Sequence, residues 1–472
     1  MLRARAWLLA LLAAAAIAPA CGGLSRLEGR RDAGSMSGDD DDAPPPPDAG
    51  RLDASSAGKS PTDAGGDARP SDGAPPDAAP PDAPPPDAAS DAAPPDAESP
   101  DSPDGGLKWD VTRVVAGGDH ACVLWSDGRV SCWGRNDSGQ LGDGTTMNRS
   151  RATEVIGLRD AVSIAAYDRF SCAVIRDGTV RCWGSTDQQR LGSVPDAPDP
   201  PWLAEPVTVP GVSGAMGLSQ GSSAAHACAL TESWLYCWGA NEFAQLAQGS
   251  SSPSAGPAAA VGGCCPVNAS GSVEDGCIVN ELGYVGCSGA SLGNSQQGDT
   301  SVFTTVPLID DARSVGTGLL FGCVLRMNGT VACWGTNGDG NLGDGTEEDA
   351  VEPVAVDGLE GVTKLAVGRH HACALLDSGT VSCWGKNLHG QLGDGTTEQA
   401  NRPVVVLEHS VSVSGQSVLD SVVDIAAGDE HTCAARGSTD VYCWGSNLYG
   451  ELGPNAKDEQ SPWPTRVFST FR

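Results

Sequence analysis

Basic residues are scarce in this sequence. Lys and Arg together number 29 among 472 residues, against 60 Asp and Glu, which gives a net charge of −31. From residue 107 to the end, 41 acids outnumber 21 bases and leave a net charge of −20. A surface of this sign repels the phosphate backbones of nucleic acids. We therefore expect no nucleic-acid partner.

The residue patterns of common catalytic and metal sites are also missing. No Ser-His-Asp arrangement, zinc-protease motif or nucleophile elbow is recognisable, and the cysteines do not cluster at the spacing of zinc ligands. The segment 337–348 places oxygen-bearing side chains at four offsets of a calcium-binding EF-hand loop, but its sixth position is Leu342 instead of glycine. We expect no catalytic residue, no bound metal and no cofactor.

Long apolar runs are absent except at the N-terminus. There, Arg3 and Arg5 precede AWLLALLAAAAIAPAC, a stretch too short to span a bilayer and typical of a signal-peptide core. Its end resembles the lipobox of bacterial lipoproteins, which implies cleavage before Cys21 and acylation of that residue. Pro19 departs from the lipobox pattern, so an ordinary cleaved signal is the alternative. We expect residues 1–21 to direct export and Cys21 to anchor the protein to a bacterial membrane, either the outer membrane or the cell surface.

Residues 22–106 contain almost no aromatic or large aliphatic side chains. They consist mainly of Asp, Ala, Pro, Gly and Ser, with 19 acids and 6 bases. Such a segment has too little apolar surface to offset the entropy cost of ordering, and its prolines favour extended conformations. We expect a disordered Asp/Ala/Pro-rich stalk that separates a folded domain from the anchor, or a spacer with no role beyond its length.

Cysteine, in contrast, is abundant and regularly placed. In CVLWSDGRVSC, residues 122–132, apolar and β-branched residues flank a central Asp-Gly, which is typical of a β-hairpin with a three-residue turn. Gly128 then takes the left-handed position of the turn. In this register Cys122 and Cys132 lie opposite each other at about 4.5 to 5.5 Å, within the range of a disulfide.

Six further cysteine pairs repeat this frame, one of them with a turn shorter by one residue. Zinc ligands and buried free thiols are the alternatives, but zinc sites favour clustered cysteines and exported proteins meet oxidising surroundings. The predicted disulfides are Cys122–Cys132, Cys172–Cys182, Cys228–Cys237, Cys277–Cys287, Cys323–Cys333, Cys373–Cys383 and Cys433–Cys443. Cys264 and Cys265 are left over, and whether they bond to each other or elsewhere stays open.

The cysteine frames start at intervals of 46 to 60 residues, which indicates seven structural repeats in residues 107–472. In the first repeat the pattern predicts four strands, over residues 112–117, 120–126, 129–135 and 153–158. Seven units of four short strands, without amphipathic helices, predict an all-β fold, a seven-bladed β-propeller. An open solenoid is the alternative, but no polar capping repeat marks either end.

The repeat GGDHACVLWSDGRVSCWGRNDSGQLGDGT resembles that of the regulator of chromosome condensation family, and the segment from Gly368 resembles it equally well. The resemblance implies a seven-bladed propeller, and the paired cysteines look like a variant of exported bacterial members. Two repeats depart from the pattern. The second lacks the Gly-Asp-Gly-Thr loop, and the fourth has Ser288 in place of tryptophan. Guanine-nucleotide exchange, the activity of nuclear members, is not expected of an exported protein.

Two residue types recur at fixed positions beside the cysteines. A residue repeated on one strand in blade after blade is expected to pack between blades, although a lectin would use such tryptophans to bind sugars. The histidines are likewise expected to be structural, because the symmetry of a ring would keep them far apart. The tryptophans are Trp133, Trp183, Trp238, Trp334, Trp384 and Trp444, and the histidines are His120, His226, His371 and His431.

Variable residues in the repeated Asn-x-x-Gly loop are the candidates for binding. Its third position holds Ser138, Phe243, Asp339, His389 and Tyr449. We expect these residues on one rim of the ring, with Phe243, His389 and Tyr449 contacting a protein partner. The sequence thus predicts a monomeric, surface-anchored, non-enzymatic protein-binding scaffold. A carbohydrate-binding or glycan-hydrolysing propeller is the alternative, which exposed tryptophans beside paired acids in one pocket would favour.

Overall fold

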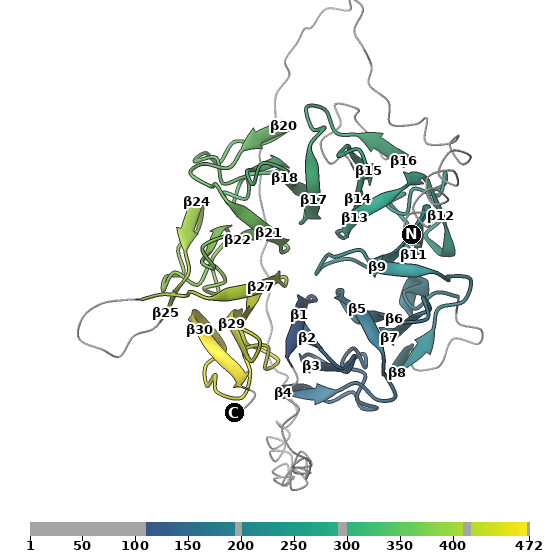
Figure 1. The fold of residues 1–472 in the computed structure, drawn as a ribbon, viewed down its shortest axis with the longest axis horizontal. Coiled ribbons are helices and arrows are strands. Elements are labelled where there is room, and N and C mark those ends of the chain that lie inside the picture. Colours follow the sequence, from purple (N-terminus) through teal and green to yellow (C-terminus); the bar gives the residue numbers. More distant parts are fainter. Residues whose placement is uncertain (1–109, 194–200, 291–299, 409–416, 470–472) are drawn as a thin grey trace, which may run out of the picture. The chain divides into compact units, whose positions relative to one another are not determined.

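The computed structural model describes residues 110–193, 201–290, 300–408 and 417–469. The predicted signal peptide, Cys21 and the predicted stalk therefore lie outside the described residues. Within the described ranges the chain forms seven four-stranded antiparallel sheets, arranged as the blades of a propeller (Figure 1). The predicted seven-bladed, all-β fold is confirmed.

Each blade uses four strands that are consecutive in the chain. Blades I to III comprise β1 (Val111–Ala116), β2 (His120–Trp125), β3 (Val130–Gly134) and β4 (Arg149–Glu154); β5 (Ala161–Ala166), β6 (Phe170–Ile175), β7 (Val180–Ser185) and β8 (Trp202–Thr208); and β9 (Ala215–Leu218), β10 (His226–Thr231), β11 (Trp234–Ala240) and β12 (Ser254–Cys264).

Blades IV to VII follow the same plan. They comprise β13 (Pro266–Gly271), β14 (Asp275–Asn280), β15 (Val285–Gly289) and β16 (Thr300–Thr305); β17 (Ala312–Thr317), β18 (Phe321–Arg326), β19 (Val331–Gly335) and β20 (Ala350–Ala355); β21 (Val362–Val367), β22 (His371–Leu376), β23 (Val381–Gly385) and β24 (Ala400–Val405); and β27 (Val422–Ala427), β28 (His431–Arg436), β29 (Asp440–Ser446) and β30 (Gln460–Ser469).

Two small elements lie outside this plan. A hairpin of β25 (Leu407–Glu408) and β26 (Ser417–Val418) lies between blades VI and VII, and a 3-10 turn, η1 (Asp187–Gln189), lies between β7 and β8. In the part of the chain that the structure describes, no helix is long and apolar enough to cross a membrane.

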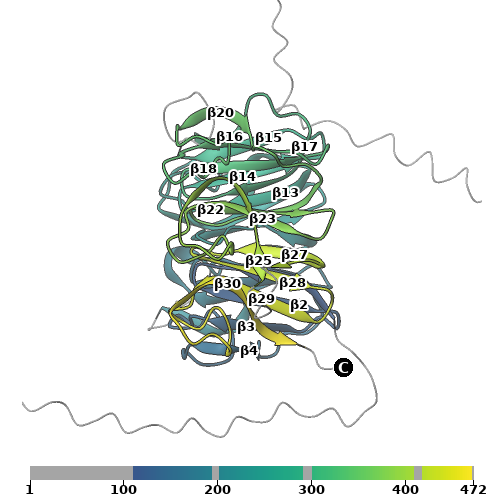
Figure 2. The same cartoon turned by 90° about the vertical axis from the view of Figure 1, so that its left-hand side faces the viewer.

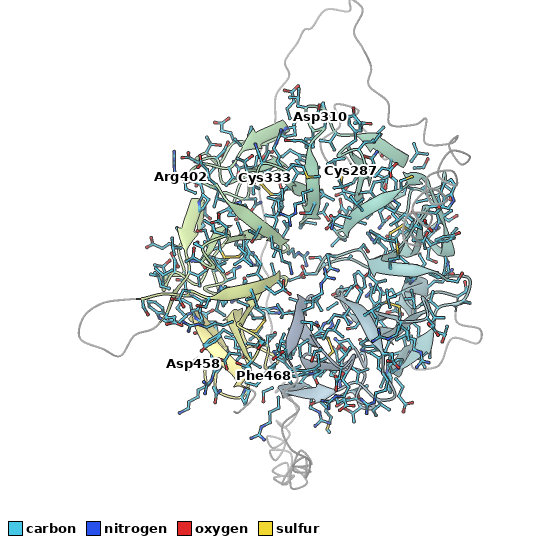
Figure 3. All side chains as sticks on the ribbon, viewed as in Figure 1. Cys287, Asp310, Cys333, Arg402, Asp458 and Phe468 are labelled. Carbon is cyan, nitrogen blue, oxygen red and sulfur yellow. A yellow bond between two sulfur atoms is a disulfide. The ribbon has the colours of Figure 1, made fainter. Side chains whose placement is uncertain are left out.

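The hairpin register agrees with the sequence prediction. Cys122 pairs with Cys132 across β2 and β3, and Gly128 has a φ of 83° at the turn. All seven predicted cysteine pairs are disulfide-bonded, with Cα–Cα distances of 4.0 to 4.2 Å. Figure 3 shows Cys287 and Cys333 within neighbouring sheets, surrounded by packed side chains. The disulfides are buried, so they form part of the packing between blades.

The leftover cysteines lie between blades III and IV. The backbone of Cys265 has a positive φ of 52° and bonds to both hairpin turns, through its N–H to the Ser233 carbonyl and through its carbonyl to the Glu281 N–H. The side chain of Cys264 lies outside the described side chains.

The predicted fourth strand of blade I is wrong in position. The sequence favoured residues 153–158, because Val155, Ile156 and Leu158 are apolar, but β4 covers Arg149–Glu154. Val155 and Leu158 are instead buried in the connection to blade II, where Gly157 adopts a positive φ. The outer strand is half exposed and polar, so its sequence carries little hydrophobic signal.

The apolar core is divided among the spaces between blades. One cluster joins Leu124 and Val130 of blade I to Ile164 and Trp183 of blade II, and similar clusters join the other blades. The ring closes between blades VII and I, where β30 packs near β4 (Figure 2). Among the described residues no strand is shared here, and packing holds the junction together with side-chain hydrogen bonds and two backbone hydrogen bonds, from Val111 to Ser438 and from Asp429 to Gly118.

Antiparallel connection gives the ring two distinct faces. The loops after the first and third strands of each blade lie on one face, here named the loop face. The cysteine-hairpin turns and the links between blades lie on the other, here named the turn face. First strands line the central axis, and fourth strands lie at the outer edge (Figure 1).

Candidate binding face

The repeated tryptophans connect neighbouring blades and are buried, as expected. Trp183 donates its indole N–H to the carbonyl of Gln140 in the preceding blade at 2.9 Å, and Trp444 makes the same bond to Gln391. Corresponding bonds run from Trp133 to Glu451, from Trp238 to Arg190 and from Trp384 to Asn341. These side chains are 0 to 1% exposed, so they are unavailable as sugar platforms.

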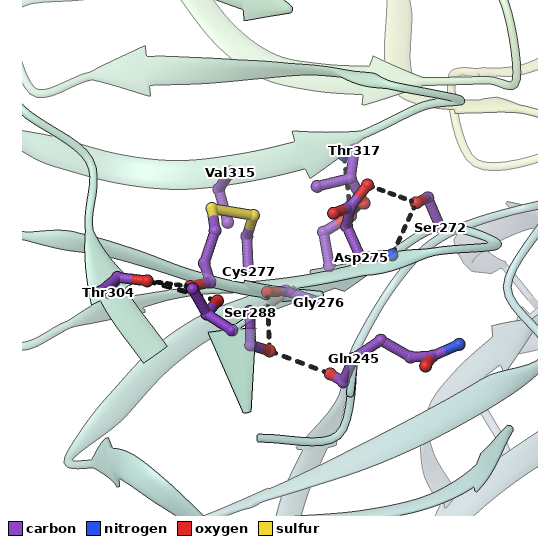
Figure 4. Close-up of a disulfide and its surroundings, with 12 residues drawn as sticks. Gln245, Ser272, Asp275, Gly276, Cys277, Ser288, Thr304, Val315 and Thr317 are labelled. Atoms are coloured by element: carbon purple, nitrogen blue, oxygen red, sulfur yellow. Dashed lines mark hydrogen bonds between the residues drawn. A yellow bond between two sulfur atoms is a disulfide. The ribbon is translucent and has the colours of Figure 1, made fainter. Parts of the chain in front are cut away.

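Blade IV keeps the same contact with a different residue. Ser288, which replaces the tryptophan, donates its hydroxyl to the Gln245 carbonyl at 3.0 Å, next to the Cys277–Cys287 disulfide (Figure 4). Blades II and IV are therefore regular four-stranded sheets despite their departures from the repeat.

The repeated histidines are also buried between blades. His120 Nε2 lies 2.8 Å from the Ser171 hydroxyl of the next blade, and His371 Nε2 lies 2.9 Å from that of Thr432. Burial lowers the pKa of His120 and His371 to about 3, and that of His226 and His431 to about 4. These imidazoles are therefore neutral at physiological pH, which fits a structural role.

The asparagine of the Asn-x-x-Gly loop organises that loop from within. Asn337 accepts a hydrogen bond from the Leu342 N–H and donates its amide to the carbonyls of Thr346 and Glu348. In the segment 337–348, whose residue spacing resembles an EF-hand, this amide occupies the middle of the loop. Across the described ranges, no group of three or more His, Cys, Asp or Glu side chains is placed to hold a metal.

The third positions of these loops lie on the loop face, but they are half-buried contacts between blades. Tyr449 of blade VII lies under the Arg135 guanidinium of blade I, 4.8 Å from ring centre to Cζ. His389 of blade VI lies 3.1 Å from a Glu430 carboxylate oxygen of blade VII. Both side chains are therefore partly buried between blades, and their predicted contact with a protein partner stays a prediction.

The second positions of these loops are the exposed ones. Leu388 and Leu448, which precede His389 and Tyr449, are 63% and 56% exposed. Ser138 is buried, and Asp339 faces His370 of the next blade. A periodic pattern identifies equivalent positions, but it does not show which of two adjacent loop residues turns outward.

Phe243 differs from His389 and Tyr449 because it lines a groove. The groove has a volume of about 270 Å³ and extends from the outer loops of blades II and III toward the ring centre. Gln245 forms part of its floor and holds the Phe243 N–H through its side-chain oxygen at 3.0 Å. Among the residues that the structure describes, no tryptophan lines it, and its polar lining includes Asp168, Glu242, Asp429, Arg190 and Arg369.

Charged groups of both signs line this groove. Arg190 pairs with Asp168 at 3.1 Å, yet its Nε is buried without a hydrogen-bond partner. Asp429 accepts a hydrogen bond from the Ser223 hydroxyl at 2.6 Å and lies 3.4 Å from Arg369. Burial raises the pKa of Asp429 to about 6, against the opposing effects of Ser223 and Arg369. The groove can therefore satisfy both donors and acceptors of a bound chain.

A loop of blade III crosses the central opening on the loop face. Residues 219–225 bond to blade IV through Gln220, whose N–H donates to Ala269 and whose carbonyl accepts from Gly271. The same loop reaches blade VII through the Ser223–Asp429 bond. Blades III and VII are not adjacent in the ring, so this segment, here named the crossing loop, spans the end of the central channel.

Sequence reasoning missed the crossing loop, Arg190 and Asp429. The one signal for the loop was length, because seven residues separate β9 and β10 where three separate β1 and β2. Gly221 has a φ of 142°, and a Cβ there would lie 1.8 Å from the Gly271 carbonyl oxygen. Such a close approach requires glycine.

Comparison with known proteins identifies the repeats. Two family models, both described as the regulator of chromosome condensation (RCC1) repeat, match the chain. One matches residues 111–140, 161–188, 362–391 and 422–451, and the other matches 127–174, 328–375 and 378–435. The chain therefore contains RCC1 repeats.

Two solved structures share the fold. Prp20p from Saccharomyces cerevisiae is similar with a TM-score of 0.59 at 18% identity, over 69% of this chain and 82% of Prp20p. Human WBSCR16 is similar with a TM-score of 0.60 at 20% identity, over 71% of this chain and 89% of WBSCR16. At these identities the likeness concerns the fold alone.

Proposed function

We propose that this protein is a non-enzymatic binding propeller that is exported, anchored to a bacterial membrane through lipid on Cys21, and extended from it by residues 22–106. Its partner is a protein segment held in the loop-face groove beside Phe243. The observation that carries the proposal is this groove, whose lining brings together the Phe243 ring and the partly buried guanidinium of Arg190.

The groove's chemistry suits a polypeptide better than a single small ion. Phe243 offers an apolar surface, and the partly exposed guanidinium of Arg190 lies in the same lining. Glu242 is exposed in that lining and can accept from an amide or a basic side chain. Aromatic and arginine side chains in a partly desolvated site are typical anchors of protein interfaces.

The fold has a precedent for protein binding. The structure of Prp20p is described together with its binding to Gsp1p and histones. That precedent supports the use of this propeller as a binding scaffold and carries no partner over to this chain.

Site-specific cross-linking tests the groove directly. The photoreactive residue p-benzoylphenylalanine replaces Phe243 in the full chain, and in a matched protein it replaces Trp234, an exposed aromatic on the turn face of the same blade. The proposal predicts a discrete adduct with an envelope protein at position 243, at least tenfold above that at position 234. Equal labelling at the two positions, or labelling at position 234 alone, would contradict the proposal that the partner binds in the groove.

Anchoring is tested separately at Cys21. In the native protein, intact-mass measurement after membrane extraction should show a diacylglyceryl-modified N-terminal cysteine. Cys21→Ser should shift most of the protein from the membrane fraction to the soluble fraction while leaving the propeller folded. An unmodified N-terminus, or cleavage at another residue, would contradict the anchor.

The second candidate function is glycan binding or hydrolysis. The observation in its favour is a pair of groove carboxylates in unequal surroundings, because Asp168 is paired with Arg190 whereas the pKa of Asp429 is raised to about 6. Against it, the described lining of the groove contains no tryptophan of the kind that a sugar platform uses. Release of reducing sugar from envelope glycans, lost in Asp429→Asn but not in Asp177→Asn on the turn face, would favour this candidate.

A further inference from the structure

The central channel contains a second cavity, separate from the groove. It has a volume of about 290 Å³ and is lined by the first strands of blades I, IV, V, VI and VII. Gln220 and Gly221 of the crossing loop line its end at the loop face. The first strands run from the turn face to the loop face, so residues near their starts, such as Arg113, Arg313 and Lys364, lie toward the turn face.

These three basic residues are unusual in a domain with a net charge of −20. The Lys364 ammonium pairs with Asp424, whose other carboxylate oxygen accepts the Val114 N–H at 2.9 Å. In the described parts of the chain, neither the Arg113 nor the Arg313 side chain forms a hydrogen bond or an ion pair. With one acid against three bases, the turn-face end of the channel carries a net charge of about +2.

Like charges held close together in a narrow channel repel one another. Burial lowers the pKa of Lys364, Asp424 opposes that effect, and the nearby positive charge of Arg113 lowers the pKa further. The polar groups nearby do not compensate this charge: Asn268 already accepts the Val315 N–H at 2.9 Å, and Ser314 and Thr363 are neutral. An anion would relieve the repulsion.

We propose that the channel binds a small dianionic oxyanion, such as phosphate or a dicarboxylate, between Arg113, Arg313 and Lys364. Guanidinium groups suit this chemistry because their N–H donors match the spacing of carboxylate and phosphate oxygens. The cavity, at about 290 Å³, has room for a small anion with some of its hydration. Gln220 and Gly221 line the far end, whereas the basic residues lie toward the turn face, from which the anion enters.

Titration of the full chain with inorganic phosphate and with malonate, at constant ionic strength set by chloride, tests the proposal. Isothermal titration calorimetry should show saturable binding of at least one of the two anions. Arg113→Gln combined with Arg313→Gln should weaken that binding at least tenfold. The control is Arg159→Gln combined with Arg176→Gln, which removes the same charge from exposed surface arginines and should change affinity less than twofold.

Thermal unfolding provides an independent readout, because an anion bound only by the folded state raises Tm. Phosphate also stabilises proteins by exclusion from their surfaces, and this effect is shared by both double variants. The proposal therefore predicts a smaller phosphate-induced rise in Tm for the channel variant than for the control. No saturable binding of either anion, or equal binding by the channel variant and the control, would overturn it.

Discussion

Between the blades, the same side chains recur at the same positions, whereas the groove and the central channel are built from residues that differ from blade to blade. Trp183, Trp384 and Trp444 each bond to a backbone carbonyl of the preceding blade. Phe243, Arg190 and Arg113 stand at repeated positions where the other blades carry different side chains. The repeated residues therefore hold the ring together, and departures from the repeat are where a ligand can be recognised.

Among changes to the repeated residues, breaking the disulfides should destabilise the fold most. Each closes a loop of about eleven residues, for which chain entropy gives roughly 2 to 3 kcal/mol, so seven together exceed the typical net stability of a domain, about 5 to 15 kcal/mol. Protein denatured, reduced and returned to native buffer under a reducing agent should fail to regain its sheet signal by circular dichroism. The same protocol without the reductant is the control, and full refolding in both would show that the disulfides are dispensable.

A single inter-blade tryptophan should matter less, but still far more than an exposed one. Trp384→Ala leaves a cavity between blades V and VI and removes the bond to Asn341, and we expect a loss of about 3 to 5 kcal/mol in unfolding free energy. Trp234, 41% exposed on the turn face, is the matched site, and its replacement by alanine should cost less than about 1 kcal/mol. Guanidinium denaturation measures the unfolding free energy of both variants. Similar losses in the two would contradict the view that contacts between blades stabilise the fold.

One position of the repeated loop predicts a pH dependence. Glu451 stands where blades I, III and VI have Gln. Its carboxyl is buried, and burial raises its pKa to about 8 from 4.5. The folded state therefore binds a proton that the unfolded state releases, so this group makes stability fall as pH rises from about 4.5 to 8. The full loss is on the order of 5 kcal/mol.

The reciprocal pair of substitutions isolates this effect. Glu451→Gln should raise Tm at pH 8.5 and change it little at pH 4.5. Gln391→Glu should introduce the same penalty in blade VI, where Gln391 is equally buried and its side-chain oxygen also accepts a loop N–H. Thermal unfolding at the two pH values measures both, and a pH-independent gain in Glu451→Gln would show that the carboxyl is ionised when folded.

The sequence predicted the structure best where the same residue type occupies the same structural position in blade after blade. Opposed cysteines and Gly128 specify the hairpin register, and Trp133 with its equivalents marks the faces between blades. The position of β4 was misjudged, because outer strands are polar and the apolar Val155 belongs to a connecting segment.

The site was harder to predict because its contacts join residues far apart in the chain. Ser223 and Asp429 meet across the ring at a separation of 206 residues, and no local pattern indicates that bond. Likewise, His389 and Tyr449 look like exposed anchors in the sequence, but each turns toward a charged residue of the next blade.

The most direct test compares Phe243→Ala with Tyr449→Ala in the full chain, measuring for each the Tm and the capture of the protein that cross-links at position 243. We predict that Phe243→Ala lowers capture at least tenfold with Tm within about 1 °C of the parent, since the ring lines a groove. Tyr449→Ala should lower Tm measurably, through loss of a contact worth about 0.5 to 1 kcal/mol, and leave capture within twofold. Capture lost in Tyr449→Ala and retained in Phe243→Ala would contradict the account.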